Sequence, residues 1–419
     1  MRMVGIALGL SLVFGLAGCN YALQGTIPGN EPTPMSAQSL PGQDFKVIRT
    51  VSAQDWDRIE CLSSTLPNFP QENERPNGRQ RDPDIIKAFG SDTPPACDVL
   101  LHYGKNWQTG TGTPVLLVHG AVTDANGSWI HPGGKPGLAP FLESQGLRVF
   151  AVTFAHSQGD NLLQAEQIAE AIERIKQVTG ASKVDVVAHS KGTMAARALA
   201  SNYHEPGFPA FRKDIHRLVL LAAPNLGLDY TFRHPLVNYG LYPEKDQPLF
   251  NAPMSWTKIL YNGIWTDTTS QTMMPTAGNY FPGQSQLLYR WDKKYPLPEN
   301  EPDWYTTYYG GQGFVSDSPG IDAAIAAGGY FIDNLRRHPV DPSVQLAVFG
   351  GDVADIPNIL NEDSGPSDGI VFTDSAMYTD DMTKGGAKLI AKELLPMNHV
   401  DLIEKKAAWN KILGVLQQP

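Results

Sequence analysis

A serine lies where the sequence predicts a sharp turn between a strand and a helix. Ser190 follows a valine-rich run that predicts a buried strand, and a helical pattern of apolar residues begins after Gly192. Such a turn strains the backbone of its central residue and requires small neighbours. Ala188 and Gly192 meet this requirement, two residues before and two after the serine. The segment therefore predicts a nucleophilic hydroxyl beside the positive end of the following helix.

A serine hydroxyl needs a base to take its proton and an acid to orient that base. His399 is the candidate base, because it lies after the last expected strand, in a loop near the C-terminus. Asp368, in the segment Ser-Asp-Gly-Ile-Val, is the favoured acid, and Asp352, just after an expected strand, is the alternative. Nucleophile, acid and base would then follow one another along the chain in an order known from hydrolases.

The reaction also needs donors for the negative oxygen that develops on the substrate. The backbone N–H of Lys191, the residue after the nucleophile, is the first candidate, and only its amide is assigned a role here. Ala121 is the second candidate, because it begins the loop after the strand expected at 113–120.

Strands and helices are expected to alternate around these residues. Such alternation predicts an α/β fold with a doubly wound, mainly parallel sheet. Strands are expected at 98–103, 113–120, 147–154, 183–189, 217–223, 344–350 and 387–395, and helices at 136–146, 161–179, from 192, 321–337 and 407–416. Residues 55–62 are interpreted as a short helix.

A long stretch rich in Trp, Tyr, Phe and Pro interrupts the alternation at 228–340. Insertions of this length usually cover a site, so we expect a cap, most of whose aromatic residues form its own core. The expected parts are a signal peptide 1–19, a tether 20–44, an N-terminal extension 45–112, a core formed by 113–227 and 341–419, and the cap 228–340.

The first residues predict export rather than part of the fold. Arg2 precedes a short apolar run, and Leu16-Ala17-Gly18-Cys19 follows it. This last segment resembles the lipobox of bacterial lipoproteins, which implies that Cys19 is acylated and anchors the protein to a membrane. By the same resemblance, Asn20 implies the outer membrane of the cell envelope. An ordinary secretory signal is the alternative.

Two further cysteines, Cys61 and Cys97, remain after Cys19. In an exported protein such a pair favours a disulfide, with two free thiols as the alternative. The net charge of the 419 residues is −10, and no run of Lys and Arg occurs. Because nucleic-acid-binding proteins present basic surfaces, we expect no nucleic-acid partner.

Several motifs together resemble the bacterial lipase and esterase branch of the α/β-hydrolases. They are V-L-L-V-H-G at 115–120, A-H-S-K-G at 188–192, A-A-P-N-L-G at 222–227, S-D-G-I-V at 367–371 and N-H-V-D at 398–401. The resemblance implies an α/β-hydrolase fold with a cap and cleavage of carboxylic esters. It implies no cofactor, although some relatives bind a structural calcium through an aspartate placed like Asp401. Ala188 and Asn225 stand where the family commonly has Gly and His, so the substrate is not carried over.

Three functions therefore remain open. The first is a lipase or carboxylesterase that acts on esters or lipids with an apolar acyl group, which the aromatic cap favours. The second is an extracellular depolymerase of aliphatic polyesters such as polyhydroxyalkanoates, since these share the Ala-x-Ser-x-Gly segment by resemblance. The third is a non-catalytic envelope lipoprotein that binds a lipid or a partner.

Overall fold

The computed structural model describes most of the chain from residue 44 onward. The described ranges are 44–67, 69–72, 80–235, 258–261, 264–267, 282–312, 317–318 and 320–418. The expected signal peptide, Cys19 and nearly all of the expected tether lie outside these ranges. No helix among the described residues is long and apolar enough to cross a membrane.

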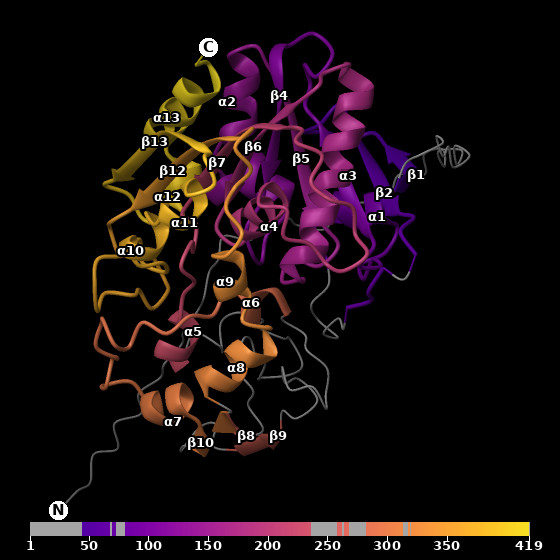
Figure 1. Cartoon of the computed structure of the whole chain (residues 1–419). Helices are drawn as coiled ribbons and strands as arrows, with labels where there is room; N and C mark the ends of the chain where they lie inside the picture. The colour runs from indigo at the N-terminus through magenta and orange to yellow at the C-terminus, as the bar shows by residue number, and fades with distance from the viewer. Residues whose placement is uncertain are drawn as a thin grey trace, which may run out of the picture.

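A nine-stranded sheet organises the molecule (Figure 1). Its strands lie in the order β1-β2-β3-β5-β4-β6-β7-β12-β13. The pairs from β5 to β13 are parallel, whereas β1, β2, β3 and β5 pair antiparallel. The strands are β1 Phe45–Val51, β2 Arg58–Ser64, β3 Asp98–Tyr103, β4 Thr111–Val118, β5 Leu147–Phe154, β6 Val184–His189, β7 Ile215–Leu221, β12 Gln345–Gly351 and β13 Lys388–Leu395. The mainly parallel sheet predicted from the sequence is confirmed.

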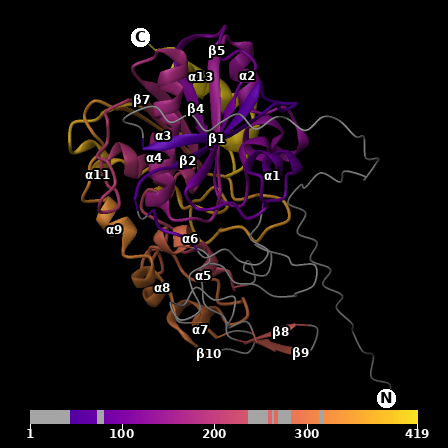
Figure 2. The same cartoon turned by 90° about the vertical axis from the view of Figure 1, so that its right-hand side faces the viewer.

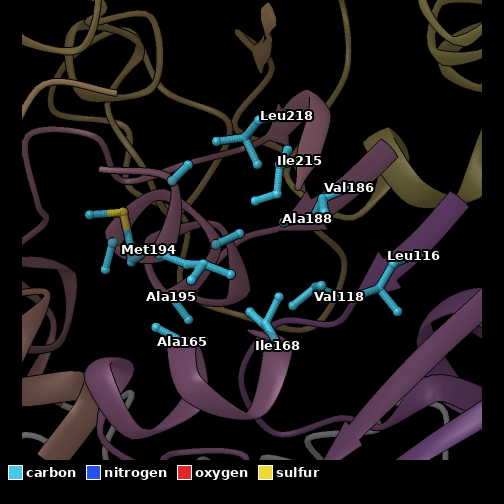
Figure 3. Packing of buried hydrophobic residues seen from close by; sticks show 14 of the residues in the cluster. Leu116, Val118, Ala165, Ile168, Val186, Ala188, Met194, Ala195, Ile215 and Leu218 are labelled. Atoms are coloured by element: carbon cyan, nitrogen blue, oxygen red, sulfur yellow. The ribbon is translucent and has the colours of Figure 1, made fainter. Parts of the chain in front are cut away.

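Helices cover both faces of this sheet. One apolar cluster joins the sheet to α3 and α4, and Figure 3 shows Ile168 and Met194 of these helices packed against the side chains of β4, β6 and β7. A second cluster joins the opposite face to α1, α2, α12 and α13. The helices are α1 Pro83–Phe89, α2 Leu138–Ser144, α3 Asn161–Thr179, α4 Gly192–Ala200, α12 Asp401–Glu404 and α13 Lys406–Leu416. Between β4 and α2 the chain also forms two short turns of helix, η1 Asn126–Ile130 and η2 Pro132–Gly134.

Helix α3 has the bounds that its sequence predicts. The Asp160 carboxylate accepts hydrogen bonds from the N–H groups of Leu162 and Leu163, which satisfies the free amides at the start of the helix. Gly180 ends the helix in a left-handed conformation with φ of 71°. The residues between these two caps bury an apolar face that includes Ile168 and Ile172.

The described helices and strands between β7 and β12 form a separate lobe below the sheet in Figure 1, and Figure 2 shows the same separation from the side. Its elements are short: α5 Tyr230–Arg233, β8 Lys258–Tyr261, β9 Ile264–Asp267, α6 Pro282–Gln286, α7 Trp304–Tyr309, β10 Gly311–Gln312, β11 Asp317–Ser318, α8 Ile321–Ala327 and α9 Phe331–Leu335. We call this lobe the cap. After β12, α10 Thr373–Ala376 and α11 Asp380–Thr383 lead to β13.

Two expectations about secondary structure are wrong. The single helix expected at 321–337 is two helices, because the chain turns at Gly328 and Gly329, and Gly329 has φ of 66°. The short helix expected at 55–62 is largely strand β2, which pairs on both sides and buries most of its side chains. Pairing in the sheet therefore overrides a weak local preference.

The disulfide expected between Cys61 and Cys97 is also wrong, because both thiols are free. The N–H of Ser64 donates to the carbonyl of Cys97 (2.9 Å), so Cys97 lies beside Ser64, three residues along β2 from Cys61. Three residues of strand span about 10 Å, which exceeds the Cα separation that a disulfide can bridge.

Candidate active site

The turn after β6 has the strained geometry that the sequence predicts. Ser190 lies at its tip with φ of 51°. A Cβ atom placed on Gly192 would lie 2.2 Å from the carbonyl oxygen of His119, at the end of β4. A Cβ atom placed on Gly120 would lie 2.9 Å from the Cβ of Ser190. Both glycines are therefore required, because the backbone of the turn passes directly against the end of the neighbouring strand.

Three residues from distant parts of the sequence meet at this turn. The Ser190 Oγ lies 2.9 Å from the Nε2 of His399, and the His399 Nδ1 lies 2.9 Å from the Oδ2 of Asp368. Asp368 and His399 are buried, whereas the serine is partly exposed. The arrangement can pass a proton from the hydroxyl to the imidazole while the carboxylate holds the other ring nitrogen.

The structure distinguishes the two candidate acids. The Asp368 Oδ1 accepts hydrogen bonds from the N–H groups of Ile370 (3.0 Å) and Val371 (2.8 Å), which leaves Oδ2 directed at the imidazole. The backbone N–H of His399 also donates to the Asp368 carbonyl (2.8 Å). Asp352 is exposed, and the His399 Nδ1 contacts Asp368 instead of Asp352.

The acid and the base share one support at the end of β12. A Cβ atom placed on Gly351 would lie 2.2 Å from the Met397 carbonyl oxygen and 3.0 Å from the Asp368 Cβ. The loops that carry Asp368 and His399 therefore pack on the same bare stretch of backbone. Larger residues at this position would push the two loops away from the sheet.

The two candidate oxyanion donors flank the serine. Lys191 is the N-cap of α4, so its N–H has no acceptor within the helix. Ala121 follows Gly120, the residue against Ser190, and precedes Val122, which has φ of 54°. Among the described residues neither amide donates to another protein group, so both are free to bind a substrate oxygen.

Two histidines, one from the motif at 115–120 and one from the motif at 188–192, hold these segments in place. The His189 Nε2–H donates to the carbonyl of His399 (3.0 Å), and burial lowers the pKa of His189 to about 3. The His119 Nδ1–H donates to the Gly120 carbonyl (2.7 Å), and burial lowers its pKa to about 4. Both rings are therefore neutral and serve as fixed hydrogen-bond partners. Their motif positions were visible in the sequence, but their partners were not.

The loop of His399 is fixed by Asn398, which sequence analysis did not single out. Its Oδ1 accepts from the N–H groups of Val400 and Asp401, and its Nδ2 donates to Asp355. Asp401, the candidate calcium ligand, forms an ion pair with Lys405 (2.7 Å). In the part of the chain that the structure describes, no three acidic, His or Cys side chains are arranged to hold a metal ion.

A mainly parallel sheet of this order, with a serine on a strained turn after a central strand, is the α/β-hydrolase fold, and the chain has this fold. A family model described as a domain of unknown function (DUF7379) matches residues 96–233, which is less than half of the chain.

Among the solved structures to which the chain is similar is lipase BlEst2 of Bacillus licheniformis in its mature form. It is 14% identical, with 75% of this chain and 97% of that chain covered, at a TM-score of 0.42. A thioesterase domain from the curacin biosynthetic pathway is 14% identical, with 77% of this chain and 95% of that chain covered, at a TM-score of 0.34. Because these scores are low, the fold is assigned from the strand order and the turn.

Proposed function

We propose that this protein is a serine hydrolase that cleaves carboxylic esters with an apolar acyl group. The observation that carries the proposal is the chain of two 2.9 Å contacts from the Ser190 hydroxyl through His399 to Asp368. The strained turn at Ser190 and the free amides beside it support the same chemistry. They are hard to explain for a protein that only binds a lipid or a partner.

The reaction would proceed in two halves. His399 takes the Ser190 proton as the hydroxyl oxygen attacks the ester carbonyl, and Asp368 stabilises the resulting imidazolium. The amides of Ala121 and Lys191 bind the tetrahedral oxyanion, and losing one such donor costs about 3 kcal/mol in the transition state. His399 returns the proton to the departing alcohol, and water then cleaves the acyl-enzyme by the same steps in reverse.

The preference for an apolar acyl group is inferred from the composition of the cap. Tyr308 is buried in the apolar cluster of the cap, and Trp291 is buried against Phe372 of the following loop. Tyr305 and Tyr309 of α7 are exposed. The remaining support is the aromatic content of the inserted segment in the sequence.

A fluorophosphonate probe tests the proposal, because it reacts with an activated serine without depending on the natural substrate. The wild type is expected to be labelled and the Ser190→Ala variant to be unlabelled, with circular dichroism unchanged. In p-nitrophenyl ester assays kcat/KM is expected to rise from acetate to longer acyl chains. A wild type that neither reacts with the probe nor hydrolyses any ester would refute the proposal.

A polyester depolymerase remains the closest alternative within the same chemistry. Parallel assays on tributyrin emulsions and polyhydroxyalkanoate films distinguish the two functions. Under our proposal tributyrin is cleaved and the film is not cleared, whereas a depolymerase would clear the film.

We also propose that Cys19 carries a lipid that anchors the protein in the bacterial cell envelope, at the outer membrane. The support is the Leu-Ala-Gly-Cys segment after a short apolar run. Expression with radiolabelled palmitate is expected to label the wild type and not Cys19→Ser. Label in both proteins, or in neither, would contradict the anchor.

A further inference from the structure

The side chain of Lys191 is buried, although the sequence predicts a role only for its amide. It is 1% exposed, and its ammonium donates to the Gln164 Oε1 (2.5 Å) of α3. Burial lowers the pKa of this ammonium, and the nearby carboxylates of Glu72 and Asp160 act in the opposite direction. A buried ammonium is tolerated only where polar partners replace water. Lys191 therefore needs the groups around it to keep their positions.

The start of α3 supplies those groups. The Asp160 Oδ1 caps the helix at Leu162, and the Asp160 backbone N–H donates to the carboxylate of Glu72. The Gln164 Nε2 in turn donates to the carbonyl of His156 (2.8 Å). The lysine thus ends in a hydrogen-bonded cluster of the core and not in solvent.

The cap closes this cluster from the other side. Its helix α6 places Gly283 so near the lysine that a Cβ atom there would lie 2.3 Å from the Lys191 Cε and 2.7 Å from its Nζ. The Gln286 Nε2 donates to Asp160 Oδ2 (2.5 Å). The Gln286 Oε1 accepts from the backbone N–H (2.7 Å) and the Nδ2 (2.8 Å) of Asn161. Five residues, Asp160, Asn161, Gln164, Lys191 and Gln286, therefore form one buried junction between cap and core, which we call the α6 junction.

We propose that Lys191 is a positioning residue that transmits the seating of α6 on the core to the oxyanion-binding amide beside Ser190. This inference rests on the proposed function, in which that amide binds the oxyanion. The side chain and the amide belong to one residue, so a displacement at the α6 junction acts directly on the donor. Misplacing a catalytic group by about 1 Å can cost a hundredfold in rate.

A double-mutant cycle tests the inference with p-nitrophenyl butyrate. Lys191→Met keeps an unbranched side chain as far as Cε and removes the ammonium, and Gln286→Leu removes the bonds of Gln286 to Asp160 and Asn161. Each single variant is expected to lower kcat about tenfold or more with KM changed less than about threefold. Because both act on one junction, the double variant is expected to be no slower than the slower single variant.

Lys176→Met is the matched control. Lys176 is also on the α3 side of the core, and it pairs with Glu173 and Asp214 at the far end of the helix. Lys176→Met removes a paired ammonium at the other end of α3 without altering the α6 junction, so kcat is expected to stay within about twofold. The rate of fluorophosphonate labelling is expected to follow kcat through the series, because phosphonylation also uses the oxyanion donors.

Wild-type kcat in Lys191→Met, or effects of the two substitutions that multiply in the double variant, would overturn the inference. If Lys191→Met does not fold, Gln286→Leu and Gly283→Ala replace it, since both alter the junction from the cap side alone. Wild-type kcat in these two variants would overturn the inference equally. A wild type without any ester hydrolysis or labelling refutes the hydrolase proposal, whereas an active wild type with unaffected variants refutes only the role of Lys191.

Discussion

The loop that carries Asp368 packs against apolar side chains on one side and against charged side chains on the other. On one side, the loop rests on the carboxyl ends of β7 and β12, where the buried side chains, among them Leu220, Val348 and Phe349, are apolar. On the other side, it meets helix α5 of the cap through ionisable groups that are almost fully buried, except for Glu301, whose side chain is 13% exposed. These are Asp229, Arg233, His234, Glu301 and Glu362, which we call the α5 ion network.

The α5 ion network is joined through Glu362 to the residue that follows the acid. The Arg233 Nε lies 2.6 Å from the Oε2 of Glu362, and the His234 Nδ1 lies 2.6 Å from the Oε1 of Glu301. The Glu362 backbone N–H donates to the carbonyl of Gly369 (2.8 Å), the residue after Asp368. Charges in the cap thus hold the far side of the catalytic loop.

The two sides are therefore expected to respond differently to a change in pH. Apolar burial does not depend on protonation, so the sheet side keeps its stability across the pH range. The contribution of an ion network changes whenever one of its members titrates. Burial alone would lower the pKa of His234, but its bonds to Glu301 and Glu362 outweigh burial and raise the pKa to about 9.

The largest expected effect is on kcat and distinguishes Asp368 from Asp352, the residue that directly follows β12. Asp368→Asn removes the charge that stabilises the imidazolium, and we expect kcat to fall about ten-thousand-fold. Asp352→Asn is the matched control, expected to change kcat less than about threefold. Steady-state ester hydrolysis measures both. The opposite ranking would show that the structure pairs the wrong aspartate with His399.

A substitution on the sheet side tests the apolar half of the comparison. Leu218→Ala truncates a fully buried side chain of β7 and is expected to destabilise the fold by about 2–5 kcal/mol. The loss in the free energy of unfolding, measured by urea denaturation, is expected to be the same at pH 6 and pH 9. A loss that varied with pH would remove the contrast with the cap side.

His234→Gln tests the charged half. The folded pKa of about 9 lies above the ordinary value of about 6.5, so the stability due to the charged ring is complete below about pH 6.5 and is lost as pH rises towards 9. The shift corresponds to about 3 kcal/mol. The difference in unfolding free energy between wild type and variant is expected to shrink by that amount from pH 6 to pH 9.5. A constant difference would mean that the ring is not charged in the folded protein.

The smallest expected effect concerns the thiols, which lie in neither region. Because Cys61 and Cys97 are free, dithiothreitol is expected to shift the Tm by less than about 1 °C. Alkylation of the denatured, unreduced protein followed by mass spectrometry is expected to modify both cysteines. A peptide pair joined by a disulfide would restore the expectation drawn from the sequence.

The sequence predicted the features that depend on local pattern. Helix α3 has the bounds expected from its sequence, and the structure shows that Asp160 and Gly180 cap it. The turn at Ser190 is predicted from its small neighbours. Asp368 is predicted from its segment Ser-Asp-Gly-Ile-Val and His399 from its place after the last expected strand, and the structure brings both to the serine.

Other contacts between distant segments could not be predicted from the sequence. The burial of Lys191 requires α6, which is more than ninety residues away in the sequence, to lie on α3. The separation of Cys61 from Cys97 depends on the register of β2 with β3. The α5 ion network likewise joins segments that no periodicity connects.

The loops of Asp368 and His399 both pack on the backbone of Gly351. We therefore expect the acid and the base to move together. Ser190 follows another strand, β6, and His189 joins its turn to the carbonyl of His399 (3.0 Å). The distance between hydroxyl and imidazole therefore depends on two strands, whereas the distance between imidazole and carboxylate depends on one support. Gentle heating is then expected to part these two groups first. The low-field NMR resonance of the proton shared by imidazole and carboxylate would outlast the reactivity of the serine.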